Sequence, residues 1–161
     1  MSTERPHIHL KDISSRTFLL EMDDTELGEM TINAPCARNG TVILSDGRRL
    51  ELSYGGEDLK GYVANEDGRR RALMLVSNIV RSGKVFTASG TDYLVELSQE
   101  PYSQMALSRQ GGRPGVMVLR SCPDSTERIQ SHVRLGDFGR EELITLLSLA
   151  AFYLLSKELG R

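Results

Sequence analysis

Two short arginine-rich segments are the strongest candidates for chemistry in this sequence. One holds two arginines and the other three, and each directly follows an Asp-Gly dipeptide. Guanidinium groups that converge on one point can bind a phosphate through paired hydrogen bonds. If both turns lie at the same end of the fold, the pattern predicts an anion or lipid-headgroup site. Its residues are Arg48, Arg49, Arg69, Arg70 and Arg71. The alternative is that these side chains only keep two hairpin exits soluble.

Two other groupings could hold a metal ion. His7 and His9 are two positions apart, which on a strand places both imidazoles on one face. No third ligand is identifiable, so an exposed pair is the preferred interpretation. Four acidic residues also lie close together: Asp23, Asp24, Glu26 and Glu29. They suit a cation or an acid and base pair, and a solvated turn between strands explains them better.

The sequence contains no motif that predicts catalysis. Cys36 and Cys122 belong to no metal, disulfide or nucleophile pattern, and no serine lies in a G-x-S-x-G elbow. We therefore expect a protein without catalytic residues, metal or cofactor. The Gly-rich loop at 110–115 keeps open an enzymatic alternative, because its backbone amides could approach an anion.

Length and composition predict one globular domain spanning 1–161, with 1–6 flexible. Hydrophobic residues make up 39% and charged residues 26%, so a core can form without disulfides. The net charge of -2 argues against nucleic acid as a partner. The first residues lead into no apolar stretch typical of a signal peptide, so we expect a cytoplasmic protein.

Short apolar stretches separated by turn signals predict a mainly β protein. Alternation is clearest where Leu50, Leu52 and Tyr54 alternate with polar residues. The Asp-Gly, Ser-Gly and Gly-Gly dipeptides between stretches favour tight hairpins, and hence an antiparallel meander. About twelve strands are predicted, at 7–11, 17–23, 29–33, 41–44, 49–54, 59–65, 71–77, 84–88, 92–97, 104–108, 116–120 and 128–135.

The segment 140–157 predicts a helix that is apolar almost all round, with Gly139 as its N-cap and Gly160 as its exit. A helix of this kind must be surrounded by lipid or by protein. Its uninterrupted apolar run, 143–155, is shorter than the roughly twenty residues that cross a bilayer. We therefore expect the strands to close into a barrel around this hydrophobic C-terminal helix.

A meander of about a dozen short strands followed by such a helix, opened by Gly139-Arg140-Glu141-Glu142-Leu143, resembles the tubby-like superfamily. That group includes the tubby C-terminal domain, the phospholipid scramblases and the LURP-one-related proteins. The resemblance implies a barrel around a central helix and a binding role, with phosphoinositide headgroups met by surface basic residues. No lipid-site residue of the family maps onto this chain.

These observations together favour a non-enzymatic module that binds anionic phospholipid or phosphoinositide headgroups, peripheral to the membrane. The alternative is a structural or protein-interaction domain, a homo-oligomer or a scaffold, with another protein as its partner and no small-molecule ligand. The sequence does not determine the oligomeric state.

Overall fold

Twelve strands and one helix make up the part of the chain that the computed structural model describes, which is residues 7–33, 38–55, 61–77, 79–99, 103–112, 116–134 and 138–159. The strands are β1 (His7–Ser14), β2 (Thr17–Met22), β3 (Thr25–Ile32), β4 (Asn39–Leu44), β5 (Arg49–Tyr54), β6 (Tyr62–Glu66), β7 (Arg69–Ser77), β8 (Ser82–Thr87), β9 (Asp92–Ser98), β10 (Gln104–Arg109), β11 (Met117–Ser121) and β12 (Glu127–Val133). The helix is α1 (Arg140–Leu159).

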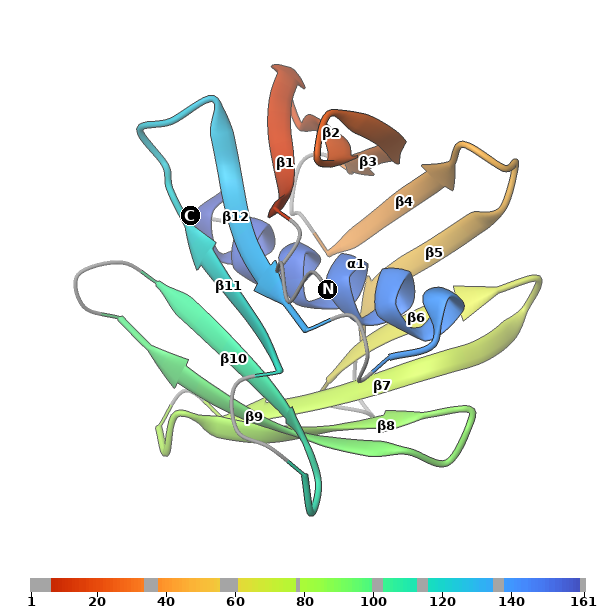
Figure 1. Ribbon diagram of the computed structural model, residues 1–161, viewed down its shortest axis with the longest axis vertical. Coiled ribbons are helices and arrows are strands. Elements are labelled where there is room, and N and C mark those ends of the chain that lie inside the picture. The colour runs from red at the N-terminus through yellow and green to blue at the C-terminus, as the bar shows by residue number, and fades with distance from the viewer. Residues whose placement is uncertain are drawn as a thin grey trace, which may run out of the picture.

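The strands form a closed barrel in which each strand pairs antiparallel with its neighbours in the chain. Closure is made by β1 and β12, which pair antiparallel from His7 opposite His132 onward. The predicted meander, barrel and strand number are confirmed, and Figure 1 shows α1 lying inside the ring of strands.

Successive turns alternate between the two ends of the barrel, because every strand reverses direction. One end carries the β2–β3, β4–β5, β6–β7 and β8–β9 turns together with the start of α1. The opposite end carries the β1–β2, β7–β8 and β11–β12 turns together with the end of α1. The condition placed on the two arginine-rich hairpins is therefore met, since both turns lie at the same end.

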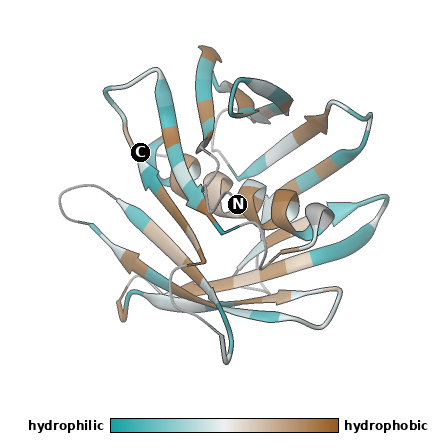
Figure 2. Cartoon of the chain, in the orientation of Figure 1, coloured by the Kyte–Doolittle hydropathy of each residue, from teal (hydrophilic) through white to brown (hydrophobic). Residues whose placement is uncertain are grey.

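The helix fills the barrel, as its all-round apolar pattern predicts. Every residue from 143 to 155 is buried, and Figure 2 shows apolar residues along α1 facing the alternating strands. The carbonyl of Gly139 accepts the first helical bond from the Leu143 N–H at 2.8 Å, which confirms the N-cap. Gly40 on β4 allows close approach, because an added Cβ would lie 3.1 Å from the Phe152 ring. The predicted exit Gly160 lies outside the described residues, as do 1–6.

The strand boundaries differ most from prediction at β3, which begins four residues earlier than expected. Asp23 and Asp24 have φ of 46° and 70°, so these two residues alone make a tight turn. Aspartate tolerates this left-handed conformation better than most residues do, and it replaces glycine here. The preferred interpretation as a turn therefore holds for Asp23 and Asp24, whereas Glu26 and Glu29 lie on β3. Tyr54, predicted on the buried face, is 40% exposed at the end of β5.

Candidate anion-binding site

The five predicted arginines surround one end of the barrel, but they lie in two different settings. Arg48 and Arg71 join a partly buried ion cluster, whereas Arg49, Arg69 and Arg70 are exposed. We call the group formed by Arg48, Glu66, Asp67, Arg69 and Arg71 the arginine mouth. It stands beside the first turns of α1 (Figure 1).

Glu66 holds the arginine mouth together. Its carboxylate accepts two bonds from Arg48, from Nε at 2.8 Å and from Nη2 at 2.9 Å, and a third from Arg71 Nε at 3.2 Å. The side chain of Glu66 is only 12% exposed. The paired hydrogen bond from Arg48 lowers the pKa of Glu66, and the positive charges of both arginines act in the same direction. Two guanidinium groups are thereby fixed in orientation.

A β-bulge places Arg71 within reach of Glu66. Asn65 of β6 is opposite Arg70, while Ala64 is opposite Ala72, so Arg71 has no register partner on β6. An extra residue of this kind re-aims the side chains of the bulged strand. Glu66 itself follows the inward alternation of Ala64, which turns its carboxylate toward the barrel rim.

The remaining arginines are arranged differently. Arg49 lies on the outer wall, 62% exposed, with its Nε 2.6 Å from Glu51. Arg69 and Arg70 follow a two-residue turn in which Asp67 and Gly68 have φ of 53° and 76°. Within the described part of the chain, neither Arg69 nor Arg70 forms an ion pair. The structure therefore gathers Arg48, Arg69 and Arg71 at the arginine mouth, leaves Arg49 on the outer wall, and exposes Arg70 opposite Asn65.

Two hollows meet at Arg71. One, of about 360 Å³, is lined by Glu66, Asp67, Arg69 and Arg71. The other, of about 90 Å³, lies between Arg71, the β8–β9 turn and the first turns of α1, where Glu142 and Thr145 line it. Glu142 accepts a bond from the Tyr93 hydroxyl at 3.1 Å. The larger hollow can thus receive an anion between two guanidinium groups.

Sequence reasoning missed Glu66 as the organising residue. The segment 66–70 repeats the pattern of 45–49, with glutamate where the first copy has serine. The signal was an acidic residue at an inward-facing position just before the three arginines of the second hairpin. The bulge has no comparable signal, because the apolar alternation of β7 starts only after it.

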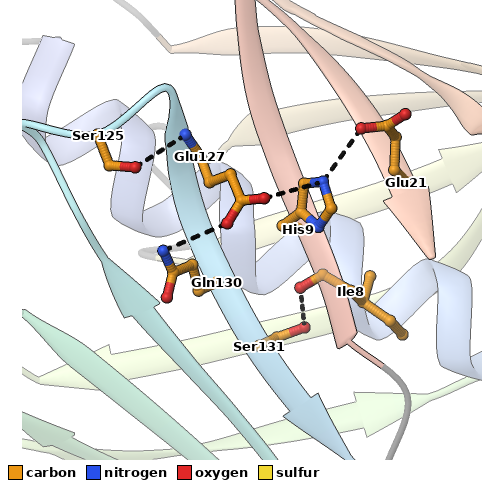
Figure 3. Close-up of polar contacts among 7 residues, drawn as sticks. All are labelled: Ile8, His9, Glu21, Ser125, Glu127, Gln130 and Ser131. Carbon is orange, nitrogen blue, oxygen red and sulfur yellow. Dashed lines mark hydrogen bonds and ion pairs between the residues drawn. The ribbon is translucent and has the colours of Figure 1, made fainter. Parts of the chain in front are cut away.

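His9 was expected to be exposed, and this expectation is wrong. It is only 5% exposed, because its Nε2 lies 3.0 Å from a carboxylate oxygen of Glu21 and 3.5 Å from one of Glu127. Figure 3 shows the ring held between these two carboxylates from β2 and β12. The contact with Glu127 crosses the seam where β1 closes the barrel against β12, and the contact with Glu21 joins β1 to its hairpin neighbour β2. The side chain of His7 lies outside the described part.

Among the residues that the structure describes, no three His, Cys, Asp or Glu side chains are grouped to hold a metal ion. Cys122 is a partly exposed thiol, and Cys36 lies outside the described residues. Residues 113–115 of the loop proposed for an enzymatic alternative are also outside them.

The described helix is not long and apolar enough to cross a membrane. No family model, curated protein or solved structure matches the chain.

Proposed function

We propose that this protein is a non-enzymatic binding module whose arginine mouth holds a phosphate-bearing anion, such as the headgroup of an anionic phospholipid or phosphoinositide. The observation that carries the proposal is the hollow of about 360 Å³ that Arg69 and Arg71 line together. A phosphate there meets two guanidinium groups, each able to donate paired hydrogen bonds.

The charge balance of the site supports an anionic ligand. Glu66 is already bonded to Arg48 and Arg71, so its charge is offset by the cluster. Arg69 and Arg70 add two further cations, and Asp67 one carboxylate. The arginine mouth itself therefore keeps an excess of positive charge, with three arginines against two carboxylates, although the whole chain is slightly acidic. Local charge of this kind attracts anions over about 10 Å at 0.1 M salt.

The filled barrel supports binding over catalysis. The buried stretch of α1 from 143 to 155 fills the interior with packed side chains, so a substrate cannot be held there. The hollows of the arginine mouth lie at the rim instead. The resemblance to the tubby-like superfamily agrees with this role, and the proposal does not depend on it.

Calorimetric titration with inositol hexakisphosphate and with inorganic phosphate tests the proposal for a soluble anion. Sedimentation with phosphatidylcholine vesicles, with and without phosphatidylinositol bisphosphate, tests it for a lipid headgroup. Removing two cations by R69Q/R70Q should weaken binding about thirtyfold, at about 1 kcal/mol for each charge. R49Q is the matched control, because Arg49 is exposed on the outer wall.

Binding should also fall steeply as salt rises, because the contacts are exposed to solvent. Wild-type protein that binds none of these probes at low salt contradicts the proposal. Equal affinity of R69Q/R70Q and R49Q for these probes also contradicts the proposal. In either case the arginines only solubilise the rim, and a structural or protein-interaction role is the remaining hypothesis.

A further inference from the structure

The β7–β8 hairpin displays two aliphatic side chains to solvent. Ile79 is 93% exposed and Val80 is 68% exposed, the highest values among the large hydrophobic residues that the structure describes. We call this pair the apolar tip. Single exposed aliphatics are ordinary, but two adjacent ones at the end of a hairpin bury nothing within their own fold.

The hairpin is held in the conformation that displays the apolar tip. Arg81 has φ of 55°, a left-handed conformation that is costly for a residue other than glycine. Its carbonyl accepts a bond of 2.9 Å from the Leu97 N–H on β9. The Val80 N–H lies 3.4 Å from the Ser77 hydroxyl, so this backbone donor has a partner inside the hairpin. A segment that enters a low-dielectric medium needs its backbone groups satisfied in this way.

Basic side chains surround the base of the tip. Arg81 lines the same shallow hollow as Lys157 of α1, and Lys84 follows on β8. The acidic Glu96 is the register partner of Ser82 and lies nearer the hairpin end than Lys84, whose partner is Leu94. Arg81, Lys84 and Lys157 together still outnumber this one carboxylate. Apolar side chains at the tip with Arg and Lys side chains behind them match a ligand that has an apolar interior and an anionic surface.

We propose that the apolar tip inserts into the interface of a lipid bilayer that contains anionic lipid. Interfacial anchors combine apolar side chains at the acyl boundary with Lys and Arg at the headgroups. A stable protein interface needs roughly 1,000 Å² or more of buried surface, which two aliphatic side chains at a projecting turn do not provide. A second copy docked tip to tip would bring Arg81 and Lys84 against their own counterparts.

This orientation separates the tip from the arginine mouth. The two lie at opposite ends of the barrel, and α1, whose twenty residues span about 30 Å, runs between them. A barrel anchored by the tip therefore holds the arginine mouth away from the same bilayer. The inference is independent of the proposed function, and the two fail separately.

A tryptophan reporter tests insertion directly, because the chain contains no Trp. In V80W, vesicles of phosphatidylcholine and phosphatidylserine should shift the emission to shorter wavelength, and brominated lipid should quench it. I43W is the matched control, since Ile43 is 54% exposed on the outer wall of β4. Unchanged emission from V80W, or equal shifts from both variants, overturns the inference.

Sedimentation with the same vesicles measures the contribution of the tip to affinity. I79S/V80S should bind at least about tenfold more weakly than the wild type, because burial of aliphatic surface is lost. I43S should bind as the wild type does, because Ile43 lies on the outer wall of β4. Wild-type binding by I79S/V80S overturns the inference. So does a wild-type dimer that I79S/V80S converts to monomer without any vesicle binding, because the occupant is then a second copy.

Discussion

The two ends of the barrel are built from the same kind of element, short turns between antiparallel strands, and they display opposite chemistry. At the arginine mouth, Arg48 and Arg71 converge on Glu66 across three strands. At the other end, the β7–β8 turn exposes Ile79 and Val80. Closure of the barrel constrains only the inward-facing positions of each strand. The rims are therefore free to diverge, and each end can meet a different partner.

The difference continues inside the rim. Near the end of α1, the ring of Tyr62 lies 5.0 Å from the rings of both Tyr54 and Tyr153, measured between centroids. Burial raises the pKa of Tyr62 and of Tyr153, and the neighbouring phenol acts in the same direction. Both hydroxyls are therefore neutral near pH 7. The Lys157 Nζ lies 4.9 Å from the centroid of the Tyr153 ring, so the charge at this end rests on an aromatic face, whereas the arginines of the arginine mouth pair with a carboxylate.

The largest effect is expected from a substitution in the central helix, which tests whether both ends of the barrel need this helix to stay folded. Leu147, midway along α1, is fully buried. L147D should unfold the protein, because an unpaired carboxylate in this core costs several kcal/mol against a total stability of about 5 to 15 kcal/mol. Circular dichroism during heating measures the loss, and I43D is the control on the outer wall. A folded L147D with an unchanged melting temperature would contradict the central role of the helix.

The next test compares two neighbouring arginines that each pair with a glutamate. R48Q removes the paired bond to the partly buried Glu66 and should lower the free energy of unfolding by about 1 to 2 kcal/mol. R49Q removes an exposed pair and should change it by less than about 0.5 kcal/mol. Urea unfolding of both variants provides the measurement. Equal effects would mean that the cluster is no more than surface charge.

Acid should lower the free energy of unfolding, and part of this loss should depend on the ion pairs of Glu66. Its pKa is lowered in the folded state, so the folded protein binds this proton less readily than the unfolded chain. The resulting stabilisation is complete above the ordinary glutamate pKa of 4.5 and is lost as the pH falls below it. E66Q should therefore lose less stability than the wild type over that interval, as urea unfolding at several pH values can show. Parallel acid profiles for the two proteins would contradict this expectation.

The sequence predicts the features that follow from a repeating apolar pattern along the chain, and it does not predict contacts between distant residues. The strands and the helix follow from alternation and from the all-round apolar run 143–155, so the barrel was predictable. The ion cluster was not, because Glu66 and Arg71 meet through a bulge that no local pattern announces. His9 was misjudged because the carboxylates that cover it come from β2 and β12. The apolar tip escaped notice because Ile79 and Val80 fall in the connection between the strands predicted at 71–77 and 84–88, where no periodic pattern indicates exposure.

The smallest expected effect is a change in stability caused by a substitution in the buried core between the two ends. Ser148 lies near the middle of α1 and is 1% exposed, and within the described residues its hydroxyl has no hydrogen-bond partner. A buried hydroxyl without a partner costs about 1 to 3 kcal/mol, and replacing serine by alanine removes it while leaving only a small void. S148A should therefore raise the free energy of unfolding by about 1 kcal/mol in urea titrations. T145V provides the comparison, because Thr145 lines the hollow beside Arg71 and its replacement should bring no such gain in stability. A stability loss in S148A would show that the hydroxyl is bonded to water, and that the hydrated rim extends into the centre of the barrel.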